Sequence, residues 1–176
     1  YTHSVNVCIL GMALARIVLK ATHRDLIYKY GPGFLLHDIG KRKLPREIME
    51  RRGALTHEEW ELMKQHPLLA FEVLGDIELP EETRQIILQH HERPDGSGYP
   101  HGLKGDQISD PAKICGIADA FDALNTKRPF KDRHTTFEAL SVIKREMLRH
   151  FDWDLFSDLV RILARPDVAD TMKSVS

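Results

Sequence analysis

The sequence lacks several features that would place it in a special class of protein. Its 176 residues contain only two cysteines, Cys8 and Cys115, which are too few for a disulfide framework and suit a reducing cytoplasm. Basic and acidic residues number 25 and 26, so no overall charge would attract a nucleic-acid polymer, although a local cluster could still hold a small anion. The apolar stretch from Val7 to Ala15 is too short to span a bilayer and follows no basic leader with a cleavage site. We therefore expect a cytoplasmic protein without a membrane segment.

Helix-forming patterns dominate what is present. Apolar residues recur with a helical period from Val5 to Leu19, and Thr56–Glu59 and Thr135–Glu138 have the form of capping boxes. Asp110 followed by Pro111 predicts an N-cap and the first helical position after it. No segment alternates with the two-residue period of a strand. Helices are expected over residues 5–19, from 56, over 80–91, 110–125, from 135, and over 152–164.

The length and these patterns predict one all-α domain. We expect a single compact bundle of about seven or eight helices over residues 1–165, followed by a flexible tail over 166–176. Because the sequence opens at Tyr1 without a methionine, we expect it to be part of a longer protein. The irregular stretch 92–109 is longer than an ordinary connection, and such loops tend to be functional.

Seven side chains beside apolar segments are candidate metal ligands. Asp119 lies in the apolar run from Ile114 to Phe121, where an unpaired carboxylate is too costly to bury, so it must meet a metal ion, a lysine or an arginine. His37 and Asp38 also follow an apolar run, and the alternative there is a helix end with a structural hydrogen bond. The full set is His3, His37, Asp38, His66, His90, His91 and Asp119.

Some neighbouring residues have simpler interpretations. On its own, His66 would be a histidine at a helix C-terminus, favoured by the helix dipole. His90 and His91 are adjacent in a helical segment, so both can reach one centre only near the end of that helix. Asp122 is expected to cap a helix or form a salt bridge rather than to bind metal. The remaining histidines have polar neighbours and are expected to be ordinary: His23, His57, His101, His134 and His150.

The candidate ligands together comprise five imidazoles and two carboxylates, more than one tetrahedral zinc ion can use. Mixed nitrogen and oxygen donors with a bridging carboxylate suit two ions of the iron or manganese type. Two such ions about 4 Å apart generate a hydroxide at neutral pH and bind both oxygens of a phosphoryl displacement. Lys41 could neutralise the developing charge, although a solvated lysine is the simpler alternative. The implied chemistry is phosphoester hydrolysis.

Four motifs resemble those of the HD-GYP domain, a subfamily of the HD phosphohydrolases. They are HDIGK at 37–41, HP at 66–67, HHERPDGSGYP at 90–100 and ADAFDALNTKRPFK at 118–131. The resemblance covers nearly the whole chain, and the long third motif is very specific. It implies an all-helical phosphodiesterase of bacterial second-messenger signalling. Such enzymes open cyclic di-GMP to linear pGpG and, in many members, to GMP.

The resemblance also implies a role for each matching residue. Asp38 would bridge the two ions, and Lys41 would face the phosphate and the attacking water. The ligands common to HD enzymes match His3, His37, Asp38 and Asp119, and the additional ligands of this subfamily match His66, His90 and His91. The residues that match the substrate-binding positions are Gly98, Tyr99, Arg128 and Lys131.

One alternative interpretation and one departure from the family pattern stay open. Taken singly, Arg128 and Lys131 would be a solvated basic patch, although an arginine can also grip phosphate with two hydrogen bonds or stack on a base. Some family members hold a third ion through an acidic residue four positions before the first histidine. That position would precede Tyr1, so two divalent ions, iron or manganese, are expected here.

Three alternatives to this function are considered. The first is a module that binds the cyclic dinucleotide without cleaving it and contacts a protein partner, such as a diguanylate cyclase domain, through the Gly-rich loop. The second is a hydrolase of another cyclic dinucleotide, such as cyclic GMP-AMP, or of a mononucleotide. The third is a protein in which the metal is only structural. A homodimer also remains open.

Overall fold

The computed structural model describes residues 2–126 and 134–165, and in this part of the chain the fold is all-α. It contains no strand there, apart from an isolated bridge between Asp95 and Lys104. Ten α-helical segments occur, of which α2 and α4 have only three and four residues. The predicted helical bundle is confirmed. The predicted tail at 166–176 lies outside the described residues.

The element bounds follow the predicted patterns closely. Short 3-10 segments occur at Ile39–Lys43, Gly105–Gln107 and Leu148–His150, and π-helical turns occur at Leu26–Tyr30 and Ile143–Met147. The α-helices are α1 (Thr2–Val18), α2 (His23–Asp25), α3 (Gly31–Leu36), α4 (Arg46–Met49), α5 (His57–Met63), α6 (His66–Leu74), α7 (Glu81–Gln89), α8 (Asp110–Asn125), α9 (Thr136–Val142) and α10 (Trp153–Leu163).

Most of the predicted helix starts are confirmed, and three details were wrong. Thr56 and Thr135 each accept a hydrogen bond from the backbone three residues on and complete capping boxes, and Asp152 caps α10. The N-cap position of α8 is Ser109, one residue before the predicted Asp110, and the side chain of Ser109 makes no capping hydrogen bond. The helix predicted to reach residue 91 ends two residues earlier, since the chain turns there into the irregular stretch.

The third correction concerns His66. It is the first residue of α6 and does not end a helix, because α5 already stops at Met63. Pro67 follows at a first-turn position, where proline loses no hydrogen bond. The dipole that would favour a charged histidine at a helix C-terminus therefore does not act on His66.

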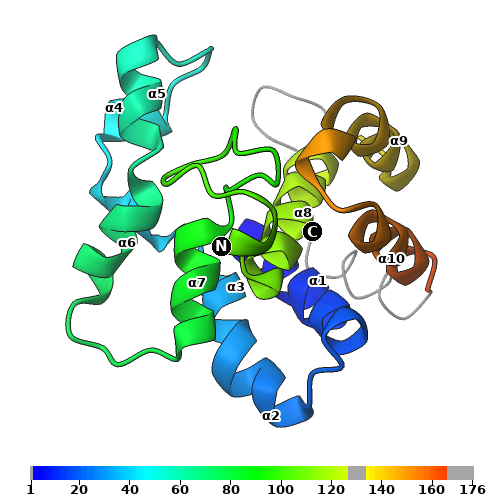
Figure 1. Ribbon diagram of the computed structural model, residues 1–176. Helices are drawn as coiled ribbons and strands as arrows, with labels where there is room; N and C mark the ends of the chain where they lie inside the picture. Colours follow the sequence, from blue (N-terminus) through cyan, green and yellow to red (C-terminus); the bar gives the residue numbers. More distant parts are fainter. Residues whose placement is uncertain (1, 127–133, 166–176) are drawn as a thin grey trace.

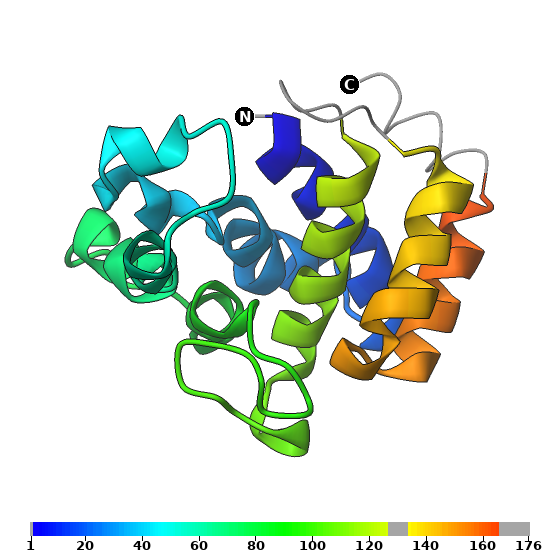
Figure 2. The same ribbon diagram turned by 90° about the horizontal axis from the view of Figure 1, so that it is seen from above.

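Helices α1 and α8 pack together at the centre of the molecule (Figure 1). Around them lie α3, α7 and α10, and the buried core between these helices includes Leu10, Leu14, Phe34, Ile117 and Leu159. The segment α4–α6 forms one flank and α9–α10 the other, an arrangement that is also clear from above (Figure 2). None of the helices in the described ranges is both long and apolar enough to cross a membrane.

Two glycines allow unusually close contacts between elements. A Cβ atom on Gly40 would collide with the backbone carbonyl of His66, which brings the 3-10 turn Ile39–Lys43 against α6. A Cβ atom on Gly116 would lie 2.7 Å from the carbonyl oxygen of His90, which brings α8 against the end of α7. These approaches place the two carboxylates Asp38 and Asp119 beside the histidines that follow α5 and α7.

Candidate metal centre

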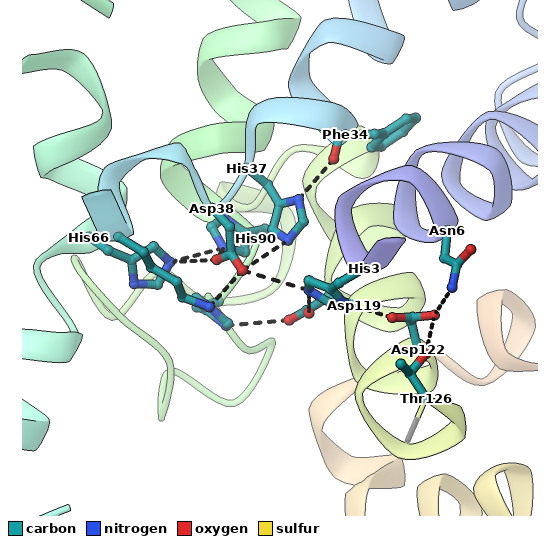
Figure 3. A network of polar contacts seen from close by, with 12 residues as sticks. His3, Asn6, Phe34, His37, Asp38, His66, His90, Asp119, Asp122 and Thr126 are labelled. Atoms are coloured by element: carbon teal, nitrogen blue, oxygen red, sulfur yellow. Dashed lines mark hydrogen bonds and ion pairs between the residues drawn. The ribbon is translucent and has the colours of Figure 1, made fainter. Parts of the chain in front are cut away.

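All seven predicted metal ligands meet at one place, although they come from five separate parts of the chain. His3 lies in the first turn of α1, Asp119 in α8, and the others lie at the ends or starts of helices. Figure 3 shows His3, His37, His66, His90 and Asp119 gathered around Asp38. The donor atoms form two groups, each with atoms within 4.8 Å of one another: Asp38, His66, His90 and His91, and His3, His37 and Asp119.

Asp38 lies between the two groups, and its two oxygens face different histidines. Oδ2 is 3.6 Å from Nε2 of both His3 and His37. Oδ1 is 3.3 Å from Nε2 of His66 and 3.9 Å from Nε2 of His90. One carboxylate can therefore supply one oxygen to each of two ions.

The hydrogen bonds of three histidines fix which ring nitrogen is free. Nδ1 of His37, His66 and His90 lies 2.8, 2.8 and 2.9 Å from the carbonyl oxygen three residues earlier. A carbonyl oxygen can only accept, so Nδ1 carries a proton, and in the singly protonated form of each ring Nε2 presents a lone pair. A second-shell bond of this kind is the usual way in which proteins orient histidine ligands of a metal.

These lone pairs meet no hydrogen of the protein. Nε2 of His37 and Oδ1 of Asp38 are buried and have no hydrogen-bond partner. Nε2 atoms of His66 and His90 lie 3.3 Å apart, although the Nδ1 atom of each ring already donates elsewhere. Two buried acceptors at that distance repel unless a cation lies near both. The donor set therefore fits divalent metal ions.

Asp119 pairs with histidines and forms no salt bridge with a lysine or arginine among the described residues. Its Oδ1 is 3.1 Å from Nε2 of His3, and its Oδ2 is 4.0 Å from Nδ1 of His91. The alternative in which a basic side chain neutralises this carboxylate is therefore not what the structure shows. Asp119 is positioned as a ligand.

The electrostatics of the site are those of ligands held ready for a cation. Burial opposes charge on Asp38, but the hydrogen bond from His3 and the nearby His37 hold the pKa of Asp38 well below its usual range. Burial lowers the pKa of His91 to about 3, so its imidazole is neutral. Burial lowers the pKa of His3 as well, but hydrogen bonds to Asp119, Asp122 and Asp38 outweigh it and raise that pKa to about 11.

Lys41 lies at the rim of the centre. Its ammonium donates to Oδ2 of Asp38 at 2.6 Å and remains partly exposed to solvent. The lysine is thus bound to the carboxylate that faces both histidine groups. It was predicted as a catalytic residue, and its position allows it to reach a phosphate placed over the centre.

The Gly-rich loop closes one side of the centre. The ring of Tyr99 stacks on His91, with centroids 4.6 Å apart and an interplanar angle of 27°. Gly98 packs directly on the backbone of Glu92 and Arg93, where a Cβ atom would collide. The resemblance implied that Gly98 binds substrate, and the close approach seen in the structure is to the loop's own first residues.

A cleft of about 470 Å³ opens beside His91 and Tyr99. Its walls combine aromatic and cationic side chains from three distant segments. Trp60 meets Tyr99 edge to face at 5.9 Å, and Arg93 lies over the ring of Phe151 at 5.1 Å without forming a salt bridge among the described residues. The lining residues are Trp60, Lys64, His91, Arg93, Ser97, Gly98, Tyr99, Met147 and His150.

Several residues of the site were missed from the sequence. Trp60 and Lys64 line the cleft and precede the HP motif at 66–67 by a few residues. His150 was expected to be an ordinary histidine but also lines the cleft. Glu92 is buried and accepts the backbone N–H groups of His101 and Leu103, at 2.7 and 2.9 Å, which holds the loop closed. A glutamate directly after two ligand histidines was the available signal.

Two predicted substrate-binding residues cannot be placed. Arg128 and Lys131 lie in the stretch 127–133, outside the described residues. Asp122, which was expected not to bind metal, belongs to neither donor group and instead contacts His3 through Nδ1 at 2.7 Å.

Comparison with known proteins agrees with this geometry. A family model described as "HD domain" matches residues 28–155. A cyclic di-GMP phosphodiesterase from Pseudomonas aeruginosa is 38% identical over 162 residues, which cover 92% of this chain and 38% of that protein. A 3'3'-cGAMP-specific phosphodiesterase from Vibrio cholerae is 37% identical over 136 residues, covering 76% of this chain and 26% of that protein.

A solved structure has the same fold. Bd1817, an HDG"Y"P protein from Bdellovibrio bacteriovorus, matches with a TM-score of 0.75 and 25% identity, over 93% of this chain and 52% of that chain. The present chain spans only about a quarter to two-fifths of the length of the curated relatives it matches.

Proposed function

Because the chain belongs to the HD domain family, we propose that it is a metal-dependent phosphodiesterase that hydrolyses cyclic di-GMP to linear pGpG. The resemblance to HD-GYP proteins is supported by relatives named as cyclic di-GMP phosphodiesterases and by the similar fold of Bd1817. GMP would be a second product if the enzyme also cleaves the linear dinucleotide.

The observation that carries this proposal is the placement of Asp38 between two groups of histidine Nε2 atoms. The first ion would be held by His3, His37 and Asp119, and the second by His66, His90 and His91, with one oxygen of Asp38 for each. Iron or manganese suits these mixed donors. When bound, such a pair would activate water at neutral pH and offset charge on a phosphate.

The chain's own residues supply the other requirements of hydrolysis. Water forms a new bond to phosphorus, the bond from phosphorus to the 3′ oxygen breaks, and the 3′ oxygen takes up a proton. Lys41 lies where its ammonium can leave Asp38 for a phosphate oxygen, and it could donate this proton. The stacked Tyr99 and His91 cover one side of the centre and help to exclude bulk water.

The neighbouring cleft suits one half of a dinucleotide. Lys64 and Arg93 provide positive charge for phosphate, and Trp60 provides a flat apolar face for a base. Arg93 has a planar group with several donors, which suits phosphate oxygens. We propose that a base and its phosphate enter this cleft while the scissile phosphate lies over the metal ions.

The double variant His37→Ala/Asp38→Ala tests the function. We expect it to lose cyclic di-GMP hydrolysis, because it removes one histidine ligand and the carboxylate shared by both groups. Its far-UV circular dichroism should stay near that of the wild type, since the apolar side chains of the helical core are unchanged. Full hydrolytic activity in this variant would remove the centre from the mechanism.

A second candidate substrate is 3'3'-cGAMP. Curated relatives specific for it are 32–37% identical to this chain, which overlaps the range of the cyclic di-GMP phosphodiesterases. The described cleft residues contain no feature that selects guanine over adenine. Product chromatography with both cyclic dinucleotides and with a cyclic mononucleotide, using protein loaded with Fe(II) or Mn(II) without oxygen, separates these substrates.

The same assay distinguishes an enzyme from a binding module. A module that reports the nucleotide to a protein partner, such as a diguanylate cyclase domain, through the Gly-rich loop would bind cyclic di-GMP and never cleave it. Metal analysis of protein purified without oxygen completes the test. Binding without turnover in protein that holds two ions per chain would favour this alternative and contradict the proposed hydrolysis.

A further inference from the structure

One ligand histidine is oriented differently from the others. His37, His66 and His90 each donate Nδ1–H to a backbone carbonyl within their own segment. His3 has Asp122 as its Nδ1 partner, at 2.7 Å, and the carboxylate of Asp122 is completely buried. This partner is a charged side chain from another helix, so the orientation of His3 depends on the packing of α1 against α8.

Asp122 is itself held in place by two further donors. The side-chain amide of Asn6 donates to Oδ1 at 2.8 Å, and the hydroxyl of Thr126 donates to the same oxygen at 2.9 Å. The other oxygen, Oδ2, accepts from His3 alone among the described side chains. Figure 3 shows Asn6, Asp122 and Thr126 behind His3, on the side away from Asp38.

Helical spacing explains why these residues meet. His3 and Asn6 are three residues apart on α1 and therefore share a face. Asp119 and Asp122 are three residues apart on α8, and Thr126 follows one turn later. Because these faces of α1 and α8 lie against each other, His3 contacts two carboxylates of α8. Its Nε2 contacts Asp119 and its Nδ1 contacts Asp122.

We propose that Asp122 is a positioning residue that holds His3 with Nε2 directed at one ion, and that it controls the affinity of that ion selectively. This inference rests on the proposed metal centre. A buried carboxylate on Nδ1 fixes the tautomer and increases the electron donation from Nε2, and loss of such a partner typically costs 10–100-fold in metal affinity. The histidines that would hold the second ion, His66, His90 and His91, form no hydrogen bond with Asp122, Asn6 or Thr126 among the described residues.

The test is a titration of metal-free protein with Mn(II), read by calorimetry and by counting bound ions. We expect two ions per wild-type chain. In Asp122→Asn and Asp122→Ala, we expect one ion to bind about 10–100-fold more weakly and the other to bind as before. Asp110→Asn is the matched control, because it removes the same charge from an exposed position of the same helix, and both affinities should stay unchanged.

Each outcome of the titration tests whether Asp122 controls the affinity of one ion. Unchanged affinity for both ions in the Asp122 variants would overturn the inference while leaving the metal centre intact. Equal weakening of both ions would also overturn it, because general loosening of the fold would act on both groups. A wild-type chain that binds no Mn(II), Fe(II) or Zn(II) would instead overturn the proposed function and, with it, the role of Asp122.

A measurement on the wild type covers the case in which both Asp122 variants fail to fold. In protein loaded with Zn(II), which is diamagnetic, nitrogen NMR of the His3 ring should show a proton on Nδ1 and the metal on Nε2. A proton on Nε2, or the metal on Nδ1, would contradict the positioning role of Asp122.

Discussion

Individual residues of the centre could be predicted to different degrees. The seven candidate ligands could be predicted from the sequence because imidazoles and carboxylates beside apolar runs are costly unless they meet a cation, and the structure brings all seven together. Asp122 was expected not to bind metal, but its partner could not be predicted. That partner, His3, lies 119 residues away, and only the packing of two helices brings them together.

The side chain of Trp60 provides a prediction for substrate binding. Trp60→Ala should raise KM for cyclic di-GMP by about 5–150-fold, because stacking of a base on an aromatic ring contributes about 1–3 kcal/mol. The value of kcat should change little, since Trp60 is not among the metal donors. Steady-state kinetics measure both quantities.

Trp153→Ala is the matched control for this substitution. Trp153 is also exposed on a helix surface but does not line the cleft. Its removal should leave KM unchanged. A similar KM for the wild type and Trp60→Ala would show that the base does not lie on this ring.

His3 gives a prediction about protons. Its pKa is raised to about 11 in the metal-free site, so at pH 8 the imidazole carries both protons. An ion that binds to Nε2 must displace one of them, and metal binding therefore releases a proton and weakens by about tenfold for each pH unit of acidification per proton. Calorimetry with Mn(II) in buffers of different ionisation enthalpy measures the release.

The variant His3→Gln serves as the reference for the released proton. It lacks the imidazole, so the number of protons released on binding should be lower by one than in the wild type. Equal numbers for the two proteins at pH 8 would show that His3 is neutral before the metal arrives.

At the scale of elements, strong helix signals in the sequence were sufficient to predict where helices lie, and weak signals were not. Capping boxes and apolar periodicity predicted α1, α5, α8, α9 and α10 within one to a few residues. No separate helices were predicted for residues 23–49, and in the structure this region consists of short α, π and 3-10 segments. Such segments have few local signals, and tertiary packing determines where they begin and end.

Gly40 provides a prediction for the packing of these segments. Gly40→Ala should lower the free energy of unfolding by about 1–3 kcal/mol, because the added Cβ would collide with the carbonyl of His66 and force the 3-10 turn away from α6. The same displacement should weaken metal binding, since Asp38 and His66 lie on the two separated elements. Urea unfolding and a Mn(II) titration measure the two effects.

Gly53→Ala is the control for that substitution. A Cβ atom at Gly53 would meet nothing within 4 Å, and its backbone does not need a positive φ. Its stability should be unchanged or slightly higher, because alanine restricts the unfolded chain. Equal stability of Gly40→Ala and the wild type would show that the two elements can separate at no cost.

At the scale of the whole molecule, the apolar contacts of the helical core are separate from the polar contacts of the metal centre, although the same helices provide both. The core is built from apolar side chains of α1, α3, α7, α8, α9 and α10, while α1 and α8 also carry His3 and Asp119 of the centre. The all-α class followed from periodicity alone. The cleft could not be predicted, because its walls come from residues 60–64, 91–99 and 147–150, whose proximity depends on the complete fold.

This separation predicts the effect of removing metal. Treatment with a chelator should abolish hydrolysis and leave the far-UV circular dichroism unchanged. Saturating metal should then raise the Tm by about 5–10 °C, since a ligand at 100 times its Kd adds about 2.7 kcal/mol and each kcal/mol shifts the Tm of a chain of this size by about 2–4 °C. Thermal scans with and without Mn(II) measure the shift.

Loss of the helical signal on chelation would contradict this expectation. It would support the alternative in which the metal is structural, because folding would then depend on the bound ion. Refolding on return of Mn(II) would distinguish that case from irreversible damage.

The carbonyl groups that accept from His37, His66 and His90 belong to Phe34, Met63 and Ile87. Every amino acid has this carbonyl, so these three hydrogen bonds do not depend on which side chain stands at those positions. An alignment of homologous sequences would therefore not reveal the groups that orient these three imidazoles. Their orientation depends on the path of the main chain, and only a change in that path would alter it.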